Sequence, residues 1–549
     1  MRNLIILMAV AVVPVWAQDL PDATGKDVTV RVCTGCHGAE MFASSHKSET
    51  DWDRTIATMT EKGLAIADAD YTTILDYLTK NLGTTPPKKA PATTPAAPAP
   101  PEPAKVPVAA APTARELLKQ LIEINTTDSV GDNTKAAEAM AVRFRDAGYP
   151  AADIQILAPV ARKGNLVVRL RGSGGANAPK PVLFIGHLDV VEAKREDWSF
   201  DPFTLLEKDG YFYGRGTLDM KGDDATLVNS FLRMKREGFV PVRDLILALT
   251  SDEEGGPANG IEFLVKDHRD LIDAAFAINP DSGGGDMRLG KRLMMTMEAA
   301  EKSSVNFQLE VTNAGGHSSR PSKDNAIYHL ADGLSRLGKF DFPVHLFDVN
   351  RAQLERSAQF YEGQLGADMK TIGTDPKNAA ALARLSAQPQ YNALLRTTCV
   401  ATLLSGGHAK NALPQIATAN VNCRVLPVDD IAEVERTLNK VLADPQIKVT
   451  NTRTTGVTPL TPIDPKVLGV VSAVTTKHWP GLPVVPKLML GASDGIYLVG
   501  AGIPTYGVSG IFSDEDDNRA HGKDERILTK SFDEAVDFMY DVVTSLAKN

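Results

Sequence analysis

The sequence predicts an α/β protein that is interrupted by an α+β insert and preceded by a small all-α module. Short apolar runs alternate with helical patterns after Thr113, the pattern changes to alternating strands near Ser303, and a Pro/Ala-rich segment separates the N-terminal part. Buried strands that alternate with helices are typical of layered α/β folds. The chain has 549 residues, more than one hydrophobic core usually serves, so several domains are expected.

The first residues, MRNLIILMAVAVVPVWAQDL, contain one cation and an apolar stretch that ends in small residues. This pattern is typical of a secretory signal, so we predict that residues 1–17 form a signal peptide cleaved near Ala17. The alternative is an uncleaved anchor, but the stretch is shorter than the roughly 20 apolar residues that span a bilayer. We predict no membrane span after signal removal, and a periplasmic or secreted protein.

Residues 18–83 contain the motif CTGCH, which has the spacing of covalent haem attachment. Cys33 and Cys36 would form the thioether bonds, and His37 would ligate the iron. The alternative is a zinc site, but no second cysteine pair lies nearby to complete it. The module resembles a small class I type cytochrome c, which implies a covalent haem c and a redox partner.

The sixth ligand of such a haem iron is predicted to be Met59, in the stretch WDRTIATMTEKG. Met41 is so close to His37 in sequence that it would reach the opposite haem face only with difficulty. His46 is a third candidate.

The other two cysteines, Cys399 and Cys423, lie in the strand-like runs TTCVATLL and ATANVNCRVLP. They would form a disulfide if these strands are neighbours. Two buried free thiols are the alternative that the sequence leaves open.

The domain boundaries follow from changes in composition. Residues 84–112 are rich in Pro and Ala and have too little bulk for a packed core, so we predict a semi-extended linker. Thr113 and Glu116 have the spacing of a capping box, which predicts that a helix and a new domain begin there. We expect a discontinuous catalytic domain in residues 113–298 and 454–549, with the α+β insert in residues 299–453.

The charge of the chain bears on its partners. The formal net charge is −9, the pI is about 5.7, and no dense Lys/Arg tract is present. There is thus no electrostatic reason to expect a nucleic acid partner, and small molecules are favoured.

Polar residues follow several of the predicted strands. Taken singly, a histidine beside a strand is usually structural and an aspartate beside glycine is usually a turn residue. Their combination is more informative. The motifs are FIGHLDVV with His187 and Asp189, GRGTLDMKG with Asp219, SDEEGG with residues 252–254, INPDSGG with Asp281, and RAHGKDER with His521.

Together with GGHSSRP, these motifs resemble those of the di-zinc peptidase and deacylase family that includes carboxypeptidase G, acetylornithine deacetylase, succinyl-diaminopimelate desuccinylase, aminoacylase and carnosinase. The resemblance covers residues 113–549. It implies a zinc-exopeptidase-like catalytic domain, a mixed sheet with helices on both faces, into which a lid domain is inserted. It also implies two zinc ions as cofactors, with cobalt or manganese as possible substitutes.

The resemblance assigns the metal ligands residue by residue. One zinc would be bound by His187 and Asp281, the other by Glu254 and His521, with Asp219 bridging both. The family often has Glu where this chain has Asp281, and the shorter carboxylate is a known variant of that position.

The resemblance also makes Glu253 the general base. Metal binding lowers the pKa of the shared water toward about 7, and Glu253 would accept its proton and later pass it to the departing amine. His187 and Asp189 lie two positions apart, so on a strand they share one face. Asp189 is therefore expected to accept a hydrogen bond from His187 and so to orient it.

The insert is expected to supply substrate contacts. By resemblance, His317 in NAGGHSSRP donates to the oxyanion, and in dimeric relatives this residue crosses from the neighbouring subunit. The runs GGHAKNALP and VNCRVLP make Asn411 and Arg424 candidates for binding the substrate carboxylate. The alternative for this pair is a turn asparagine and a salt-bridged arginine. A homodimer through the lid is expected from resemblance alone.

The predicted function is an exported di-zinc hydrolase with a tethered cytochrome. Its substrate would be an amide or peptide bond next to a free carboxylate, as in a dipeptide, a peptide C-terminus or an N-acyl amino acid. The alternative is an electron-transfer or haem-based redox-sensing protein, in which the hydrolase domain is a degenerate or regulated binding platform.

Overall fold

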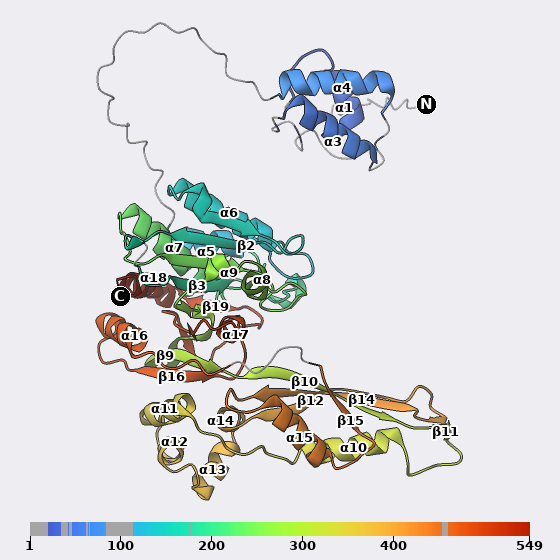
Figure 1. Cartoon of the computed structure of the whole chain (residues 1–549), viewed down its shortest axis with the longest axis vertical. Helices are drawn as coiled ribbons and strands as arrows, with labels where there is room; N and C mark the ends of the chain where they lie inside the picture. The colour runs from blue at the N-terminus through green and yellow to red at the C-terminus, as the bar shows by residue number, and fades with distance from the viewer. Residues whose placement is uncertain are drawn as a thin grey trace, which may run out of the picture. The chain divides into compact units, whose positions relative to one another are not determined.

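The computed structural model describes residues 20–34, 42, 45, 47–61, 64, 66–83, 113–175, 178–452 and 459–548. The chain divides into two compact units, one within residues 1–106 and the other within residues 107–549 (Figure 1). The predicted signal peptide, residues 1–17, and the predicted linker, residues 84–112, lie outside the described residues.

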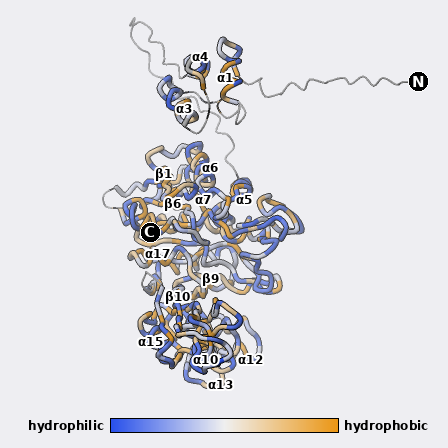
Figure 2. The backbone as a smooth tube through the Cα atoms, turned by 90° about the vertical axis from the view of Figure 1, so that its right-hand side faces the viewer, coloured by the Kyte–Doolittle hydropathy of each residue, from blue (hydrophilic) through white to orange (hydrophobic). Residues whose placement is uncertain are grey.

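The described part of the first unit is helical. Its helices are α1 (Lys26–Cys33), α3 (Glu49–Glu61) and α4 (Asp68–Asn81). Each carries both hydrophobic and hydrophilic residues (Figure 2), and the hydrophobic ones close a core around the buried rings of Trp52 and Tyr77. The Trp52 indole N–H donates to the Leu82 carbonyl over 3.0 Å, so the large ring is buried with its polar atom satisfied.

The larger unit is built on a six-stranded mixed sheet. Its strand order is β1-β2-β6-β3-β7-β17, in which β3, β6, β7 and β17 run parallel and β1 and β2 complete the sheet by antiparallel pairing. In chain order the strands are β1 (Ile154–Leu157), β2 (Asn165–Leu170), β3 (Val182–His187), β6 (Leu245–Thr250), β7 (Phe276–Ile278) and β17 (Thr505–Tyr506). The expected mixed sheet is therefore present.

Helices cover both faces of this sheet. Successive strand residues point to opposite faces, so Phe184 packs in one hydrophobic core while Leu183 and Ile185 pack in another. The helices on the first face are α5 (Ala114–Ile122), α6 (Asn133–Asp146), α7 (Lys221–Arg236) and α18 (Thr529–Leu546). Those on the second face are α8 (Gly260–Asp267), α9 (Arg269–Ile272) and α17 (Gly495–Gly500).

The start of α5 has the local structure that its sequence predicts. The Thr113 hydroxyl accepts the Glu116 N–H, and the Glu116 carboxylate accepts the Thr113 N–H at 2.6 Å. This capping box satisfies two backbone donors that would otherwise lack partners at the helix end. The helix then buries Leu117, Leu118 and Leu121.

Two smaller sheets complete the part of the chain that the sequence predicts to be catalytic, called the catalytic part below. One has the order β16-β9-β8-β18 and the other β19-β5-β4. Their strands are β4 (Leu206–Lys208), β5 (Tyr211–Tyr213), β8 (Gly284–Arg288), β9 (Lys291–Glu301), β16 (Val484–Met489), β18 (Phe512–Asp514) and β19 (Arg526–Leu528). Helix α16 (Pro465–His478) and the short helices η4 (Arg195–Asp197) and η5 (Pro280–Ser282) connect or flank them, whereas the short helix η2 (Ala151–Asp153) precedes β1 of the six-stranded sheet.

The lid is an antiparallel sheet of order β12-β14-β10-β15 with a separate core. Its elements are β10 (Ser303–Thr312), α10 (Ala326–Leu337), β12 (Thr398–Gly406), β14 (Ile416–Val425), α15 (Ile431–Leu442) and β15 (Lys448–Asn451), with the short pair β11 (Gly316–His317) and β13 (Ala412–Leu413). Cys399 and Cys423 face each other on β12 and β14 and form a disulfide, which settles the choice that the sequence left open.

Residues within the predicted insert contribute to two different cores. The lid core contains Phe307 and Leu309, whereas Leu354 and Met369 pack into the large core of the catalytic part, with Leu488 of β16. The helices of this second group are α11 (Asp348–Ser357), η6 (Ala358–Phe360), α12 (Gln364–Thr374), α13 (Ala379–Ser386) and α14 (Pro389–Leu395). They extend the catalytic part, as Figure 1 shows for α11 beside β16.

None of the described helices combines the length and the apolar composition needed to cross a bilayer.

Candidate active site

The polar residues predicted from the sequence gather at one edge of the mixed sheet. His187 ends β3, the acidic triplet of residues 252–254 follows β6, and Asp281 follows β7 in η5. Because these strands are parallel, their carboxyl ends lie at the same edge. Asp219 joins them from the turn before α7, and His521 from the loop between β18 and β19.

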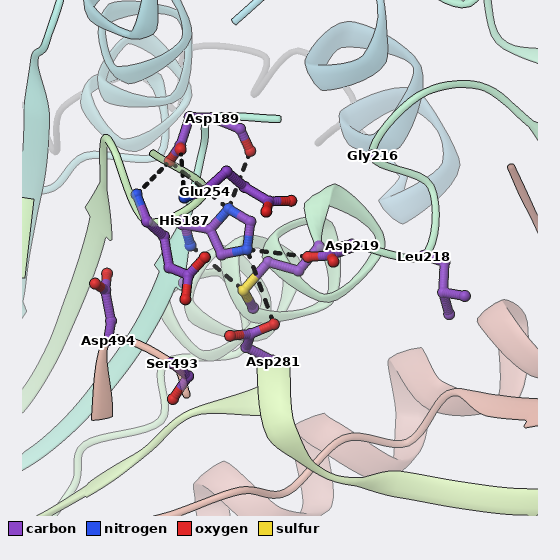
Figure 3. Close-up of polar contacts among 12 residues, drawn as sticks. His187, Asp189, Gly216, Leu218, Asp219, Glu254, Asp281, Ser493 and Asp494 are labelled. Atoms are coloured by element: carbon purple, nitrogen blue, oxygen red, sulfur yellow. Dashed lines mark hydrogen bonds and ion pairs between the residues drawn. The ribbon is translucent and has the colours of Figure 1, made fainter. Parts of the chain in front are cut away.

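Asp219 contacts both histidines of this cluster, and Figure 3 shows its contact with His187. Its Oδ1 is 3.1 Å from His187 Nε2 and its Oδ2 is 3.0 Å from His521 Nε2. On the His521 side, Nε2 is also 2.9 Å from Glu254 Oε1. On the His187 side, Nε2 is 3.8 Å from Asp281 Oδ1. The five residues predicted as metal ligands are thus brought together, although they come from distant parts of the chain.

Two groups of side chains in this cluster could hold a metal ion. In His187, Asp219 and Glu254 the ligand atoms lie within 4.8 Å of one another, and the same is true of His187, Glu253 and Asp281. Imidazole and carboxylate donors suit zinc, and they also suit cobalt or manganese. The donor set therefore fits the metals that the sequence implies.

The electrostatics of the cluster also fit a cation. Burial alone would lower the pKa of His187, but the hydrogen bond to Asp219 and the nearby carboxylate of Asp281 raise it well above its ordinary value. Hydrogen bonds to Asp219 and Glu254 raise the pKa of His521 to about 10. Desolvation and the neighbouring Asp281 raise the pKa of Glu253 to about 10. The excess of carboxylates thus attracts protons, which a metal ion would displace on binding.

Asp189 makes different contacts from the expected ones. His187 Nδ1 lies 3.0 Å from the backbone carbonyl of Asp189 and 3.7 Å from its carboxylate. The carboxylate instead accepts the backbone N–H groups of Glu253 at 3.2 Å and Glu254 at 3.0 Å. Asp189 therefore orients His187 through its main chain and holds the two glutamates through its side chain.

Asp252, the first member of the acidic triplet, points away from the metal-ligand cluster. Its side chain is fully buried and pairs with Lys163, whose ammonium group also lies 2.6 Å from Asp128 Oδ1. Asp252 has a left-handed backbone with φ of 61° and accepts the Ala258 N–H, so it forms the turn that presents the glutamates. Sequence reasoning missed Lys163, because one lysine in a loop gives no recognisable signal.

The loop LGASDGIY contacts residues at the ends of strands β6 and β7. Asp494 accepts hydrogen bonds from the Thr250 hydroxyl at 3.1 Å and the Asn259 amide at 2.6 Å. Ser493 accepts one from the Asn279 amide at 3.0 Å. Both side chains are buried beside the cluster (Figure 3), and burial raises the pKa of Asp494 to about 7.

The predicted lid residues lie apart from the cluster. His317 and Asn411 are exposed neighbours, since His317 pairs with Ala412 and the Ser318 N–H donates to the Asn411 carbonyl. They belong to the β11–β13 end of the lid (Figure 1). Among the residues that the structure describes, no hydrogen bond or ion pair joins either of them to the cluster. Arg424 is half-buried on β14, opposite Thr398 and Ser304.

The predicted haem ligands are described only in part. Cys33 is the half-buried last residue of α1, and Met59 is half-buried on α3. Burial raises the pKa of the Cys33 thiol to about 11. Cys36 and His37 lie outside the described residues, as do Met41 and His46.

Comparison with known proteins gives a family match over most of the larger unit. The family model described as peptidase family M20/M25/M40 matches residues 183–545. Human N-fatty-acyl-amino acid synthase/hydrolase PM20D1 is 28% identical over 376 residues, which cover 66% of this chain and 74% of that protein. Probable carboxypeptidase S-like 2 of Dictyostelium discoideum is 28% identical over 385 residues, covering 67% of this chain and 72% of that protein.

Solved structures give the same result for the fold. The M20 family metallo-carboxypeptidase Sso-CP2 from Sulfolobus solfataricus superposes with a TM-score of 0.59 at 18% identity, covering 79% of this chain and 99% of that one. Human carnosine dipeptidase 1 superposes with a TM-score of 0.54 at 16% identity, covering 79% of this chain and 96% of that one. The chain belongs to peptidase family M20/M25/M40 and is a metallopeptidase of that family.

Proposed function

We propose that this chain is an exported di-zinc hydrolase that cleaves an amide or peptide bond next to a free carboxylate. The observation that carries the proposal is the position of Asp219, which directs one carboxylate oxygen to His187 and the other to His521. A carboxylate placed in this way can bridge two metal ions. In this assignment His187 and Asp281 would hold one ion, Glu254 and His521 would hold the other, Asp219 would be shared, and cobalt or manganese could replace zinc.

The metal ions, when bound, supply Lewis acidity and lower the pKa of water at the site. Glu253 is the general base. It takes a proton from the water whose oxygen attacks the amide carbonyl carbon, and it returns a proton to the nitrogen as the C–N bond breaks. The products are a carboxylate and a free amine. Asp189 keeps Glu253 in place, because it accepts the backbone N–H of that residue.

The proposed substrates are dipeptides, C-terminal residues of peptides, and N-acyl amino acids. The printed names of three relatives support this range: an N-fatty-acyl-amino acid synthase/hydrolase, a probable carboxypeptidase and a carnosine dipeptidase. Arg424 and Asn411 are the proposed ligands of the substrate carboxylate. The planar fork of arginine suits that group.

We further propose that the lid forms a homodimer, in which His317 serves the active site of a second copy. His317 and Asn411 are exposed. The edge strand β12 also exposes Val400, Leu403 and Leu404, at 61%, 69% and 70%. An unpaired edge with apolar side chains is suited to pairing with another chain.

For the first unit we propose a covalent haem c, bound through Cys33, Cys36 and His37 with Met59 as the sixth ligand. Cys33 packs against the small helical core beside partly buried Val30, Val32 and Phe42, an apolar environment of the kind that a porphyrin requires. Haem attachment outside the cytoplasm agrees with a periplasmic or secreted protein. The haem would exchange electrons with a redox partner.

Purified full-length protein tests these proposals directly. Metal and haem analysis is expected to give two zinc ions and one haem per chain, and a screen of dipeptides and N-acyl amino acids is expected to find hydrolysis. Hydrolysis only of substrates with a free carboxylate would support the role of Arg424. Two bound metals without hydrolysis of any substrate would instead favour the alternative, an electron-transfer or redox-sensing protein with a degenerate hydrolase domain.

A further inference from the structure

A buried ion pair joins the loop that carries Asp219 to the loop that carries His521. Arg215 lies in GRGTLD, four positions before the proposed ligand Asp219. Glu525 lies in AHGKDE, four positions after the proposed ligand His521. Arg215 Nη1 and Glu525 Oε2 are 2.6 Å apart, and the two side chains are 3% and 0% exposed. Such a pair is costly to bury unless its remaining hydrogen-bonding atoms are also used.

The Glu525 carboxylate also accepts hydrogen bonds from the backbone of the Asp219 loop. Its Oε1 accepts the N–H groups of Leu218 at 2.8 Å and Asp219 at 3.1 Å, and its Oε2 accepts the Gly216 N–H at 3.1 Å. The Glu525 carboxylate therefore fixes the backbone from Gly216 to Asp219, the proposed bridging ligand.

Arg215 reaches the other loop. Its Nη2 donates to the carbonyls of His521 at 3.4 Å and Gly522 at 3.2 Å, and its guanidinium lies 5.0 Å from the centre of the Trp198 ring. His521 has a left-handed backbone with φ of 60°, a conformation that few residues adopt without support. The two carbonyl contacts supply that support.

We propose that Arg215 and Glu525 are positioning residues that hold Asp219 and His521 at the separation one metal ion requires, before the ion binds. This inference rests on the proposed di-metal site. The other metal position depends on the pair only through the shared Asp219, because His187 is held by strand β3 and Asp281 by the turn that follows β7. Loss of the pair is therefore expected to weaken the position that uses both Asp219 and His521 more than the position that shares only Asp219.

The test is a zinc titration of metal-free full-length protein, with Glu525→Gln and Arg215→Lys as the variants. Removing outer partners of metal ligands typically reduces affinity about 10- to 100-fold. We expect wild type to bind two ions and both variants to lose about this factor at the His521 position, with a clearly smaller loss at the position of His187 and Asp281. Arg215→Lys retains the positive charge and removes only the forked guanidinium group. It therefore tests the positioning role even if Glu525→Gln does not fold.

Arg169→Met is the matched control, because Arg169 forms a half-buried ion pair with Asp244 away from the site. It is expected to leave both zinc affinities unchanged. Equal weakening of both ions, or no weakening in either variant, would overturn the positioning role. A wild type that binds fewer than two ions would instead overturn the proposed di-metal function, so the two failures are distinguishable.

Discussion

Three neighbouring carboxylates, Asp252, Glu253 and Glu254, have three different sets of contacts. Asp252 pairs with Lys163 in the interior, Glu254 contacts His521, and Glu253 groups with His187 and Asp281. Consecutive side chains in an extended or turning backbone point in different directions. Adjacent like charges are therefore tolerated here, because each one has a separate positive or metal-binding partner.

Two substitutions separate the proposed roles of the adjacent glutamates. Glu253→Gln removes the base and is expected to lower kcat about 10²- to 10⁴-fold while zinc remains bound. His521→Ala removes a ligand and is expected to lower zinc content and activity together. Zinc analysis beside steady-state kinetics checks both. Equal loss of zinc in the two variants would reverse the assignment of Glu253 and Glu254.

Lys163→Met tests the support beneath the acidic triplet. It leaves the fully buried Asp252 carboxylate without a cation, which typically costs about 3 to 5 kcal/mol. Urea unfolding measures the loss. Lys180→Met is the control, because Lys180 and its partner Asp273 are exposed and such pairs contribute about 0 to 1 kcal/mol. Similar effects of both changes would contradict the special role of Lys163.

At the scale of the elements, the lid has its own electrostatic support where α10 meets the segment after α15. His329 Nδ1 lies 2.6 Å from Asp444 and its Nε2 lies 3.1 Å from Asp324. The hydrogen bond to Asp444 is the main cause that raises the pKa of His329, and burial opposes it. This contact joins two elements of one core, so it bears on the stability of the lid.

His329→Gln is expected to make lid stability less dependent on pH. The folded-state pKa of His329 is raised, so its stabilisation is complete below the ordinary histidine pKa of about 6.5 and is lost as pH rises through the raised value. Thermal unfolding at a series of pH values should show the largest difference between wild type and variant at acidic pH. A difference that grows with rising pH would contradict the assignment.

At the scale of the whole molecule, the larger unit contains a complete set of proposed ligands and an incomplete set of substrate contacts. The metal-ligand cluster is assembled within one chain, while His317 and Asn411 are exposed on the lid. The proposed second copy would supply the missing donor.

Leu403→Lys tests the proposed dimer. A lysine on an exposed edge strand opposes pairing with another chain, so the variant is expected to be monomeric and weakly active. Light scattering after size exclusion measures the mass, and hydrolysis is measured on the same fractions. Val240→Lys, a change at a residue that is 63% exposed outside the lid, is the control and should leave both unchanged. A fully active monomer would contradict the role of a second copy.

The haem state tests the alternative function. Each unit closes its own hydrophobic core, so we expect equal hydrolysis rates in full-length protein with the iron oxidised or reduced. Absorption spectra establish the redox state before each assay. Unequal rates would favour the redox-sensing alternative over a simple tether.

The sequence by itself determined the elements whose signals are local. The capping box at Thr113 and the alternating burial along β10 follow from neighbouring residues. The candidate ligands were recognised only from the combination of their motifs, which resembles that of a known family, because each residue taken singly has an ordinary structural explanation. Cys36, His37 and the signal peptide remain predictions, since they lie outside the described residues.

Only the tertiary structure decided the contacts between segments that are distant in the sequence. It shows that Cys399 and Cys423 form a disulfide, that helices α11 to α14 pack in the core of the catalytic part, and that Asp252 pairs with Lys163. It also placed the Arg215–Glu525 pair between two ligand loops. The physical reason is that a buried charge or thiol is defined by the partner that packing brings to it, and local sequence patterns contain no information about that partner.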